Sequence, residues 1–248
     1  MRCSPTRSAF TFAVLLLLAP VAAAEGLSID APWGDGMVIQ RGEPVTVRGA
    51  AGPGETVVVA FAGKKRKATA DGDGRWTVSF DAVKPGPARR LTVETGSGGR
   101  IEVRDILAGD VWICSGQSNM AWTVGKSKDA TKEIAAAKYS KIRLYTVPRR
   151  PMVRPAPMAH QTWHACSPKT VGGFSAVGYY FGRELAKELR VPIGLINTSY
   201  GGTPAEAWTR REALPPGRLR QRHREMLASK KAGARLPSCL WNGMVHAL

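Results

Sequence analysis

The sequence has 248 residues, and its 36 lysines and arginines against 19 acidic residues give a net charge of +17. Such a charge alone can attract acidic glycans, nucleic acid or an anionic membrane surface. The basic residues are scattered, however, and no recognisable nucleic-acid-binding motif accompanies them. We therefore interpret the charge as surface chemistry and expect neither a nucleic acid nor a membrane as partner.

The first 24 residues have the pattern of a secretory signal peptide. Two arginines precede an apolar run over residues 9–18, and three small residues end at Ala24. The apolar run is too short for a membrane span, and nothing later resembles one. We expect cleavage near Ala24 and a secreted or periplasmic protein.

Three cysteines remain after the predicted cleavage, namely Cys114, Cys166 and Cys239. An odd number in an oxidising compartment leaves at least one thiol unpaired unless chains cross-link. Cys114 and Cys166 are the pair that we would test, with Cys239 left over. No cluster of cysteine and histidine has the spacing of metal ligands, so we expect no metal, and we expect no cofactor.

Residues 25–105 have the pattern of a small β-rich module. Short β-branched or aromatic runs alternate with glycine- and proline-containing turns, at residues 45–48, 56–61, 75–80, 91–94 and 101–103. Several short strands at near-regular spacing predict a β-sandwich-like module. Trp76, Val78 and Phe80 share one face by alternation, so we expect them in its core.

Residues 106–248 alternate strand and helix signals. The predicted elements are a helix at 129–138, a strand at 142–147, a proline-rich connection at 148–157, a helix at 176–190 and a strand at 192–197. Ser175 is the predicted N-cap of the second helix. Strand, helix, strand at this spacing predicts a parallel sheet with right-handed crossovers.

The helix at 176–190 carries apolar residues at every fourth position. These residues, with Tyr180 beside them, are Val177, Phe181, Leu185 and Leu189. Such a stripe is typical of the buried face of a helix, so we expect it to face the core.

The segment G-D-V-W-I-C-S-G-Q-S-N-M at 109–120 predicts a buried strand that opens into a tight loop at Gly116. Serine hydrolases place their nucleophile on a sharp turn at the end of a strand. Ser115 and Ser118 both qualify. The alternative is a turn whose polar side chains only satisfy the local backbone.

A second loop, at 197–208, follows the last predicted strand. Ligands bind at the carboxyl ends of strands in open parallel sheets. The pair Gly201 and Gly202 lets backbone N–H groups approach a ligand closely, as an oxyanion site requires. The alternative is a glycine turn before a helix, with Pro204 near its first position.

Taken together, three long segments resemble bacterial sialate O-acetylesterases, which are carbohydrate esterases of the SGNH-hydrolase class. They lie at 109–120, 173–185 and 191–208. The segments P-W-G-D-G-M-V-I-Q-R-G-E-P-V and D-G-D-G-R-W-T-V resemble the family's β-rich N-terminal region. The resemblance runs from about residue 31 to 208 and resumes at L-W-N-G-M-V, residues 240–245.

The resemblance implies roles for several residues. Ser118 would be the nucleophile, and Ser115 a loop residue. Gly202 or its neighbour Gly201 would offer an oxyanion N–H, with the Ser118 N–H as the second donor. Gln117 and Asn119, on either side of the serine, are candidate substrate-binding residues. The implied substrates are O-acetyl groups on sugars such as sialic acid.

The sequence also departs from the family pattern. Family members continue into a W-Y-Q-G-E-type loop, which completes the oxyanion hole, and a later carboxylate–histidine pair. This sequence stops at Leu248 with neither, so we expect a truncated family member. The histidines present lack a family-like acidic context: His160, His164, His223 and His246. Without a base, Ser118 would be a poor nucleophile.

The predicted fold class is α/β, with a β-sandwich-like module at 25–105 followed by an incomplete flavodoxin-like (SGNH hydrolase) parallel-sheet domain at 106–248. An unfinished sheet would expose a hydrophobic edge. The predicted function is carbohydrate O-acetylesterase, incomplete in this chain, acting on an acetylated carbohydrate. The alternatives are a non-catalytic exported glycan-binding protein and an inactive gene fragment.

Overall fold

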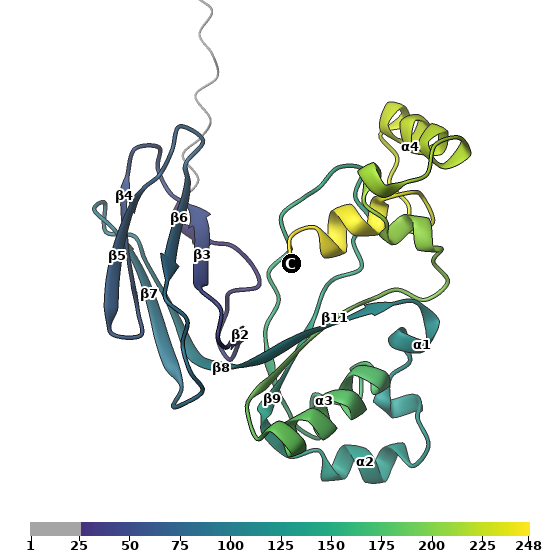
Figure 1. The fold of residues 1–248 in the computed structure, drawn as a ribbon, viewed down its shortest axis with the longest axis horizontal. Coiled ribbons are helices and arrows are strands. Elements are labelled where there is room, and N and C mark those ends of the chain that lie inside the picture. Colours follow the sequence, from purple (N-terminus) through teal and green to yellow (C-terminus); the bar gives the residue numbers. More distant parts are fainter. Residues whose placement is uncertain (1–25) are drawn as a thin grey trace, which may run out of the picture.

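A computed structural model describes residues 26–248, and the predicted signal peptide lies outside these residues. The chain has a mixed α/β fold with more than one sheet (Figure 1). The strands are β1 Ser28–Ile29, β2 Val38–Gln40, β3 Val45–Ala50, β4 Thr56–Phe61, β5 Lys64–Thr69, β6 Arg75–Phe80, β7 Arg89–Thr95, β8 Arg100–Gly116, β9 Tyr139–Thr146, β10 His164–Cys166 and β11 Ile193–Ser199.

The helices gather in the second half of the chain. The α-helices are α1 Ser118–Ala121, α2 Ala130–Ala136, α3 Ala176–Leu189 and α4 Arg218–Ser229. The 3₁₀ turns are η1 Val124–Lys126, η2 Ala205–Trp208 and η3 Arg211–Ala213, and η4 Trp241–Val245 is a π-helical turn. The strand and helix signals of the sequence at 142–147, 176–190 and 192–197 correspond to β9, α3 and β11.

Two antiparallel sheets face each other in the first half of the chain. One has the order β1-β3-β6, and the other contains β5-β4-β7-β8. The alternating burial of β6 places Trp76, Val78 and Phe80 in the core, as predicted. There Phe80 contacts Phe61 of β4 edge to face, with ring centroids 5.6 Å apart.

Strand β5 was missing from the sequence prediction, because four consecutive basic residues, Lys64 to Lys67, hide its strand pattern. All four are exposed on the outermost strand of the larger sheet. Charged side chains on an edge strand discourage pairing with another chain.

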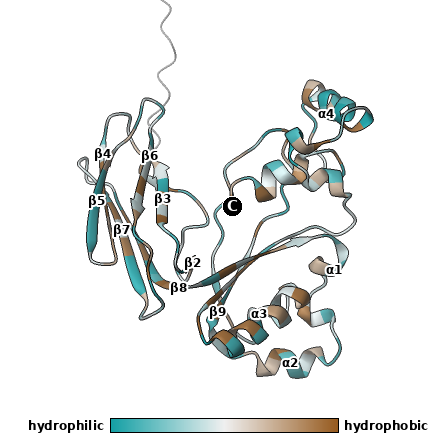
Figure 2. Ribbon diagram, viewed as in Figure 1, coloured by the Kyte–Doolittle hydropathy of each residue, from teal (hydrophilic) through white to brown (hydrophobic). Residues whose placement is uncertain are grey.

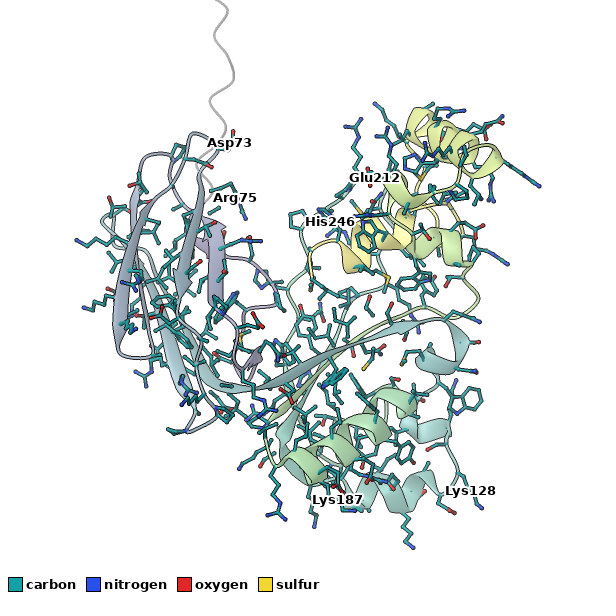
Figure 3. The ribbon with its side chains drawn as sticks, in the orientation of Figure 1. Asp73, Arg75, Lys128, Lys187, Glu212 and His246 are labelled. Carbon is teal, nitrogen blue, oxygen red and sulfur yellow. The ribbon has the colours of Figure 1, made fainter. Side chains whose placement is uncertain are left out.

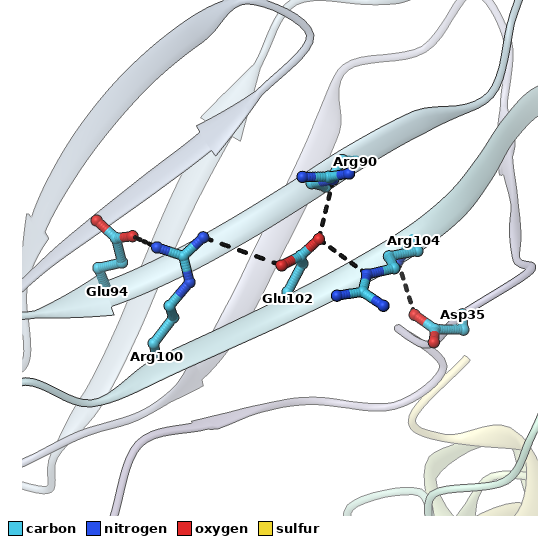
Figure 4. Close-up of polar contacts among 6 residues, drawn as sticks. All are labelled: Asp35, Arg90, Glu94, Arg100, Glu102 and Arg104. Carbon is cyan, nitrogen blue, oxygen red and sulfur yellow. Dashed lines mark hydrogen bonds and ion pairs between the residues drawn. The ribbon is translucent and has the colours of Figure 1, made fainter.

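An ion-pair network covers part of the exposed surface of β7 and β8 (Figure 4). The Glu102 carboxylate accepts a hydrogen bond from Arg104 Nε at 2.9 Å, forms an ion pair with Arg90 Nε at 2.9 Å, and lies 3.9 Å from the Arg100 guanidinium. The hydrogen bond from Arg104 is the main cause that lowers the pKa of Glu102. Much of the positive charge on these strands is therefore paired within the protein.

Strand β8 connects the two halves of the molecule (Figure 1). Its first part pairs with β7, its middle with β2, and its last part with β11. Asp105 lies between the first and middle parts with a left-handed φ of 57°. The buried Arg143 of β9 binds this bend, since its Nη1 donates to Asp105 Oδ2 at 2.6 Å and to the Gly36 carbonyl at 3.1 Å.

The second half is built on three parallel strands in the order β8-β11-β9, with β10 antiparallel at the edge. The prediction of a parallel sheet is confirmed. A flavodoxin-like order would instead place the first strand, β8, between the other two. That part of the predicted fold class is wrong. Strand β11 instead pairs with β8 on one side and β9 on the other, and all seven of its residues are buried, as its central position requires.

Helix α3 begins as predicted, because the Ser175 hydroxyl accepts from the Gly178 N–H at 3.1 Å. Its buried face differs in part from the predicted one. Val177, Phe181 and Leu189 are 48%, 42% and 43% exposed, so the prediction of a buried stripe is wrong at these positions. Leu185 and Tyr180, from the same predicted stripe, are partly buried against the core cluster. Figure 2 shows the extensive hydrophobic colouring that α3 carries.

Close packing explains which face of α3 is buried. The buried residues of the helix are Ala176, Gly178, Tyr179 and Gly182. A Cβ on Gly182 would lie 2.6 Å from Cδ1 of Leu195 in β11, so only glycine allows the helix to lie this close to the sheet. Phe181 instead packs at the surface against Trp112 of β8, with ring centroids 5.0 Å apart.

All three described cysteines are free and buried, so the suggested Cys114–Cys166 disulfide is not formed. Burial raises the pKa of Cys114 to about 11 and that of Cys166 to about 12. Thiols in such surroundings are packed as small apolar groups.

Within residues 26–248, no helix is long and apolar enough to cross a bilayer. The same residues contain no cluster of three or more histidine, cysteine, aspartate or glutamate side chains arranged to hold a metal ion.

Candidate active site

Ser118 lies where strand β8 turns into helix α1. The strand ends at Gly116, whose φ of +142° is rarely adopted by residues with a side chain. Ser118 is the first residue of α1, and its side chain is exposed. The strand and tight turn that the sequence predicts are thus both present, and they place this serine at the carboxyl end of the parallel sheet. The predicted burial of the strand is wrong, however, because Trp112 and Ile113 are 42% and 52% exposed on β8, which has only β11 as a neighbour along this part of its length.

The loop after β11 lies against this turn. The Tyr200 N–H donates to the Gly116 carbonyl at 3.0 Å, which continues the pairing of the two strands into the loops. A Cβ on Gly201 would lie 3.6 Å from the Ser118 Cα, so a side chain added at Gly201 would contact the Ser118 backbone. Gly202 follows with a left-handed φ of 73°.

Two backbone N–H groups converge on a single oxygen atom at this contact. Gln117 Oε1 accepts from the Ser118 N–H at 2.8 Å and from the Gly202 N–H at 3.3 Å. Of the two glycines named by the sequence, Gly202 therefore supplies the converging donor, while Gly201 makes the close approach. Paired donors of this kind, aimed at one point beside a serine, form the geometry of an oxyanion hole.

The other candidate residues lie close by but make different contacts. Ser115 is a residue of β8 rather than of a loop, which corrects the implication of the resemblance, and its hydroxyl donates to the Thr198 carbonyl at 3.3 Å. Asn119 is exposed on α1, and its carbonyl accepts from the Trp122 N–H. Ser118 is thus the serine beside the converging donors.

None of the four histidines is hydrogen-bonded to Ser118 among residues 26–248. His160 and His246 line a separate cleft of about 800 Å³ beside Asp30 and Arg75. His164 is exposed on β10. His223 is buried in α4, and burial lowers its pKa. The described residues therefore bring together a serine and two converging N–H donors, and they place no histidine within hydrogen-bond distance of that serine.

The segment at 240–245 is hydrogen-bonded to β11, the strand that leads into the second loop of the site. The Met244 carbonyl accepts from the buried Thr198 hydroxyl of β11 at 3.0 Å. The Asn242 side chain donates to the Met152 and Val153 carbonyls at 3.2 and 3.0 Å, which satisfies the backbone of the proline-rich connection. Sequence reasoning assigned no role to Asn242, and an asparagine among apolar residues was the available signal.

A serine on a strand-to-helix turn, beside two converging N–H groups on an α/β fold, is the arrangement typical of serine hydrolases. Comparison with known proteins narrows this class. The family described as carbohydrate esterase, sialic acid-specific acetylesterase, matches residues 108–242. The chain belongs to this family, and the resemblance noted in the sequence is confirmed.

Relatives with assigned names agree with this membership. The chain is 32% identical to a human sialate O-acetylesterase over 94% of this chain and 48% of that protein. It is 32% identical to a mouse sialate O-acetylesterase over 81% of this chain and 41% of that protein. The crystal structure of a carbohydrate acetylesterase from Xanthomonas citri matches with a TM-score of 0.80 and 34% identity, covering 90% of this chain and 48% of that one. The chain spans about half the length of these relatives.

Proposed function

We propose that this chain takes part in the hydrolysis of O-acetyl esters on sugars of the sialic acid class, with Ser118 as nucleophile. The observation that carries the proposal is the convergence of the Ser118 and Gly202 N–H groups on one oxygen position beside that serine. Family membership supports the substrate class. The comparisons do not favour the alternative of a non-catalytic binding protein.

In the proposed reaction, Ser118 Oγ attacks the acetyl carbonyl and loses its proton to a general base. The carbonyl oxygen becomes the oxyanion and takes the position that Gln117 Oε1 occupies, so the Gln117 side chain turns outward. The sugar leaves with a proton as an alcohol, and water then hydrolyses the acetyl-serine to acetate. Gln117 and Asn119, exposed at the rim, would contact the sugar.

The general base is the component that residues 26–248 do not place beside Ser118. The resemblance implies that a carboxylate–histidine pair supplies it in the family. We propose that the corresponding residues belong to the half of the relatives' length that this chain does not match. The Gly202 and Ser118 N–H groups would then stabilise the oxyanion, and the base from that half would take the proton of the Ser118 hydroxyl.

The two-part organisation is proposed as well. The facing sheets of residues 25–105 support a β-sandwich-like module, and the parallel strands of 106–248 support the N-terminal part of an SGNH-type esterase domain. The arginine-flanked apolar run within residues 1–24 supports a signal peptide and export. An acetylated carbohydrate is the proposed partner.

Acetyl transfer to Ser118 tests the nucleophile. The full chain is incubated with p-nitrophenyl acetate, whose leaving group departs without being protonated, and peptides are then analysed by mass spectrometry. We expect one acetyl adduct on the peptide that carries Ser118, formed faster than on other serines because the two N–H groups stabilise the tetrahedral intermediate. Ser118→Ala should remove the adduct.

Ser115→Ala is the matched control, because it removes a hydroxyl three residues away that donates to a backbone carbonyl. This variant should keep the Ser118 adduct. Acetylation of Ser115 in preference to Ser118, or labelling of Ser118 no faster than of surface serines, would contradict the proposal.

A further inference from the structure

A groove of about 500 Å³ lies between the start of β9 and the second half of α3. Figure 3 labels Lys187 on this part of α3. Five basic side chains line the groove, namely Lys138, Lys141, Arg183, Lys187 and Arg190. Its only acidic lining residue is Glu184. The groove therefore gathers five basic side chains around a single acidic one.

The charges in the groove are only partly balanced. Glu184 pairs with Arg183 at 3.2 Å and with Lys187 at 3.9 Å. Arg183 also pairs with Glu133 at 2.6 Å. The remaining basic residues, Lys138, Lys141 and Arg190, form no ion pair within residues 26–248. This contrasts with β7 and β8, where arginines surround Glu102. An anion in the groove would relieve the repulsion between these cations.

The floor of the groove is apolar. Ile142 is buried, and Ala186 and Val191 pack against the same core cluster. Tyr139 adds an aromatic side chain to the lining. Cations at the rim of an apolar floor fit a ligand that has both a flat apolar face and a negative charge. A sugar ring that carries a carboxylate has this chemistry.

Arg190 occupies a position that favours glycine. It ends α3 with a left-handed φ of 56°, where a residue with a side chain is less stable than glycine. An arginine here weakens the helix end, yet it adds a cation to the groove. Replacing Arg190 with glycine should therefore stabilise the helix end and at the same time remove a cation from the groove, so the effects on stability and on binding have opposite signs.

The groove is distant from Ser118. In the pairing of β11, Ile193 lies opposite Ile142 at the groove end, and Ser199 lies opposite Gly116 at the serine end. Seven strand residues separate the two ends by about 20 Å. A ligand in the groove would therefore leave Ser118 accessible.

We propose that this groove binds a carboxylate-bearing glycan and holds an acidic sugar chain while an acetyl group elsewhere on it reaches Ser118. The choice of a glycan rests on the proposed function, whereas the anionic character of the ligand rests on the groove itself. The groove is an anchoring site and takes no part in the bond changes at the ester.

The test measures binding of an acetyl-free sialic acid oligomer to the full chain by isothermal titration calorimetry at low ionic strength. The groove variant carries Lys138→Ser, Lys141→Ser and Arg190→Gly, and we expect it to bind at least about tenfold more weakly because three unpaired cations are removed. The control variant carries Lys65→Ser, Arg66→Ser and Lys67→Ser on β5, which removes the same charge from an exposed strand. It should change affinity less than about twofold.

Arg190→Gly alone provides a second measurement. It should weaken binding while raising the melting temperature, a combination that unfolding cannot produce. Equal losses in the groove and control variants, or no binding by the unmodified chain, would overturn the proposal. Tighter groove-dependent binding of single-stranded DNA of equal charge would also overturn it, in favour of a nucleic acid. Ser118→Ala should leave binding unchanged, so the groove is tested independently of acetyl transfer.

Discussion

At the Ser118 turn, a side chain and a reaction intermediate compete for the same donors. Gln117 Oε1 accepts from both N–H groups that an oxyanion would need. Replacing Gln117 with alanine removes this acceptor. We expect the amide hydrogens of Ser118 and Gly202 to exchange with solvent about fivefold faster, because each loses a hydrogen bond worth about 1 kcal/mol.

Hydrogen exchange and amide chemical shifts measured by NMR can check this prediction without any catalytic turnover. Asn119→Ala is the matched control, since that side chain is exposed on α1 beside the donors. It should leave both exchange rates unchanged. Unaltered resonances of Ser118 and Gly202 in Gln117→Ala would show that the carboxamide does not occupy the donors in solution.

The sequence predicted the turn but not the occupancy of its donors. The glycine and small polar residues around Ser118 indicate a tight loop at the end of a strand. The contact between Gln117 and Gly202, however, joins residues 85 positions apart. It forms only because β8 and β11 pair in a register that brings Gly116 opposite Ser199. No short stretch of the sequence specifies the register in which these two strands pair.

The buried thiols lead to a second prediction at the residue scale. Cys114 and Cys166 have pKa values raised to about 11 and about 12, because burial disfavours the thiolate. Both thiols should resist a disulfide reagent at pH 8 in the native protein and react fully in denaturant. Since the unfolded chain loses its thiol protons first, the free energy of unfolding should fall as pH rises above about 9, by up to 1.4 kcal/mol per thiol and pH unit.

Urea unfolding at a series of pH values measures this loss, and Cys114→Ala should remove one thiol's share of it. Rapid labelling of the native protein at pH 8 would mean that the cluster around Cys114 opens readily. If Cys114 and Cys166 failed to react with the reagent even in denaturant, they would be joined in a disulfide, contrary to the free thiols of the structure.

At the scale of the element, α3 shows where hydrophobic periodicity misleads. Its start and length follow from the Ser175 cap and from a run of helix-compatible residues. The buried face follows from shape, because Gly178 and Gly182 allow the helix to approach the sheet. A hydropathy pattern ranks Phe181 far above either glycine, so it selects the wrong face.

This packing predicts that two neighbouring substitutions change stability by different amounts. Phe181→Glu should change stability by less than about 1 kcal/mol, because Phe181 is 42% exposed and mainly loses its contact with Trp112. Gly182→Ala adds a single methyl group but should cost about 1–3 kcal/mol, because that group would meet Leu195 at 2.6 Å. Urea unfolding of both variants measures the difference.

Phe181→Glu should also reduce self-association, since the exposed Phe181 lies against the exposed Trp112 of β8 and two other residues of α3, Val177 and Leu189, are exposed as well. Sedimentation velocity over a range of protein concentrations measures this effect. A large loss of stability in Phe181→Glu together with a neutral Gly182→Ala would mean that the predicted face, and not the observed one, is buried.

At the scale of the whole molecule, the sequence predicted the kinds of element and their order along the chain. The regular turns of residues 25–105 indicated antiparallel strands, and the strand–helix–strand pattern indicated parallel pairing. The order β8-β11-β9 was not predictable in this way. The order depends on which strand is buried on both of its faces. The apolar pattern of the short run at 192–197 does not differ enough from that of the strand at 142–147 to show which of the two is central.

The connection between the two halves yields the last prediction. Arg143 is 8% exposed, and its guanidinium donates to Asp105 Oδ2, the Gly36 carbonyl and the Ser140 carbonyl. These partners belong to the bend in β8, the loop before β2 and the start of β9. Arg143→Met keeps the length of the side chain but leaves the carbonyls without a donor. We expect a loss of about 2 kcal/mol in the free energy of unfolding.

Because Arg143 joins elements of both halves, its loss should also separate their unfolding. Urea transitions followed by tryptophan fluorescence and by far-ultraviolet circular dichroism should coincide in the unmodified chain and diverge in Arg143→Met. Arg41→Met is the matched control. Arg41 pairs with Asp110 at 2.7 and 3.1 Å but lies at the surface, so solvent replaces its contacts and its removal should cost less. Equal losses in the two variants, with coincident transitions in both, would show that the buried guanidinium does not couple the two halves.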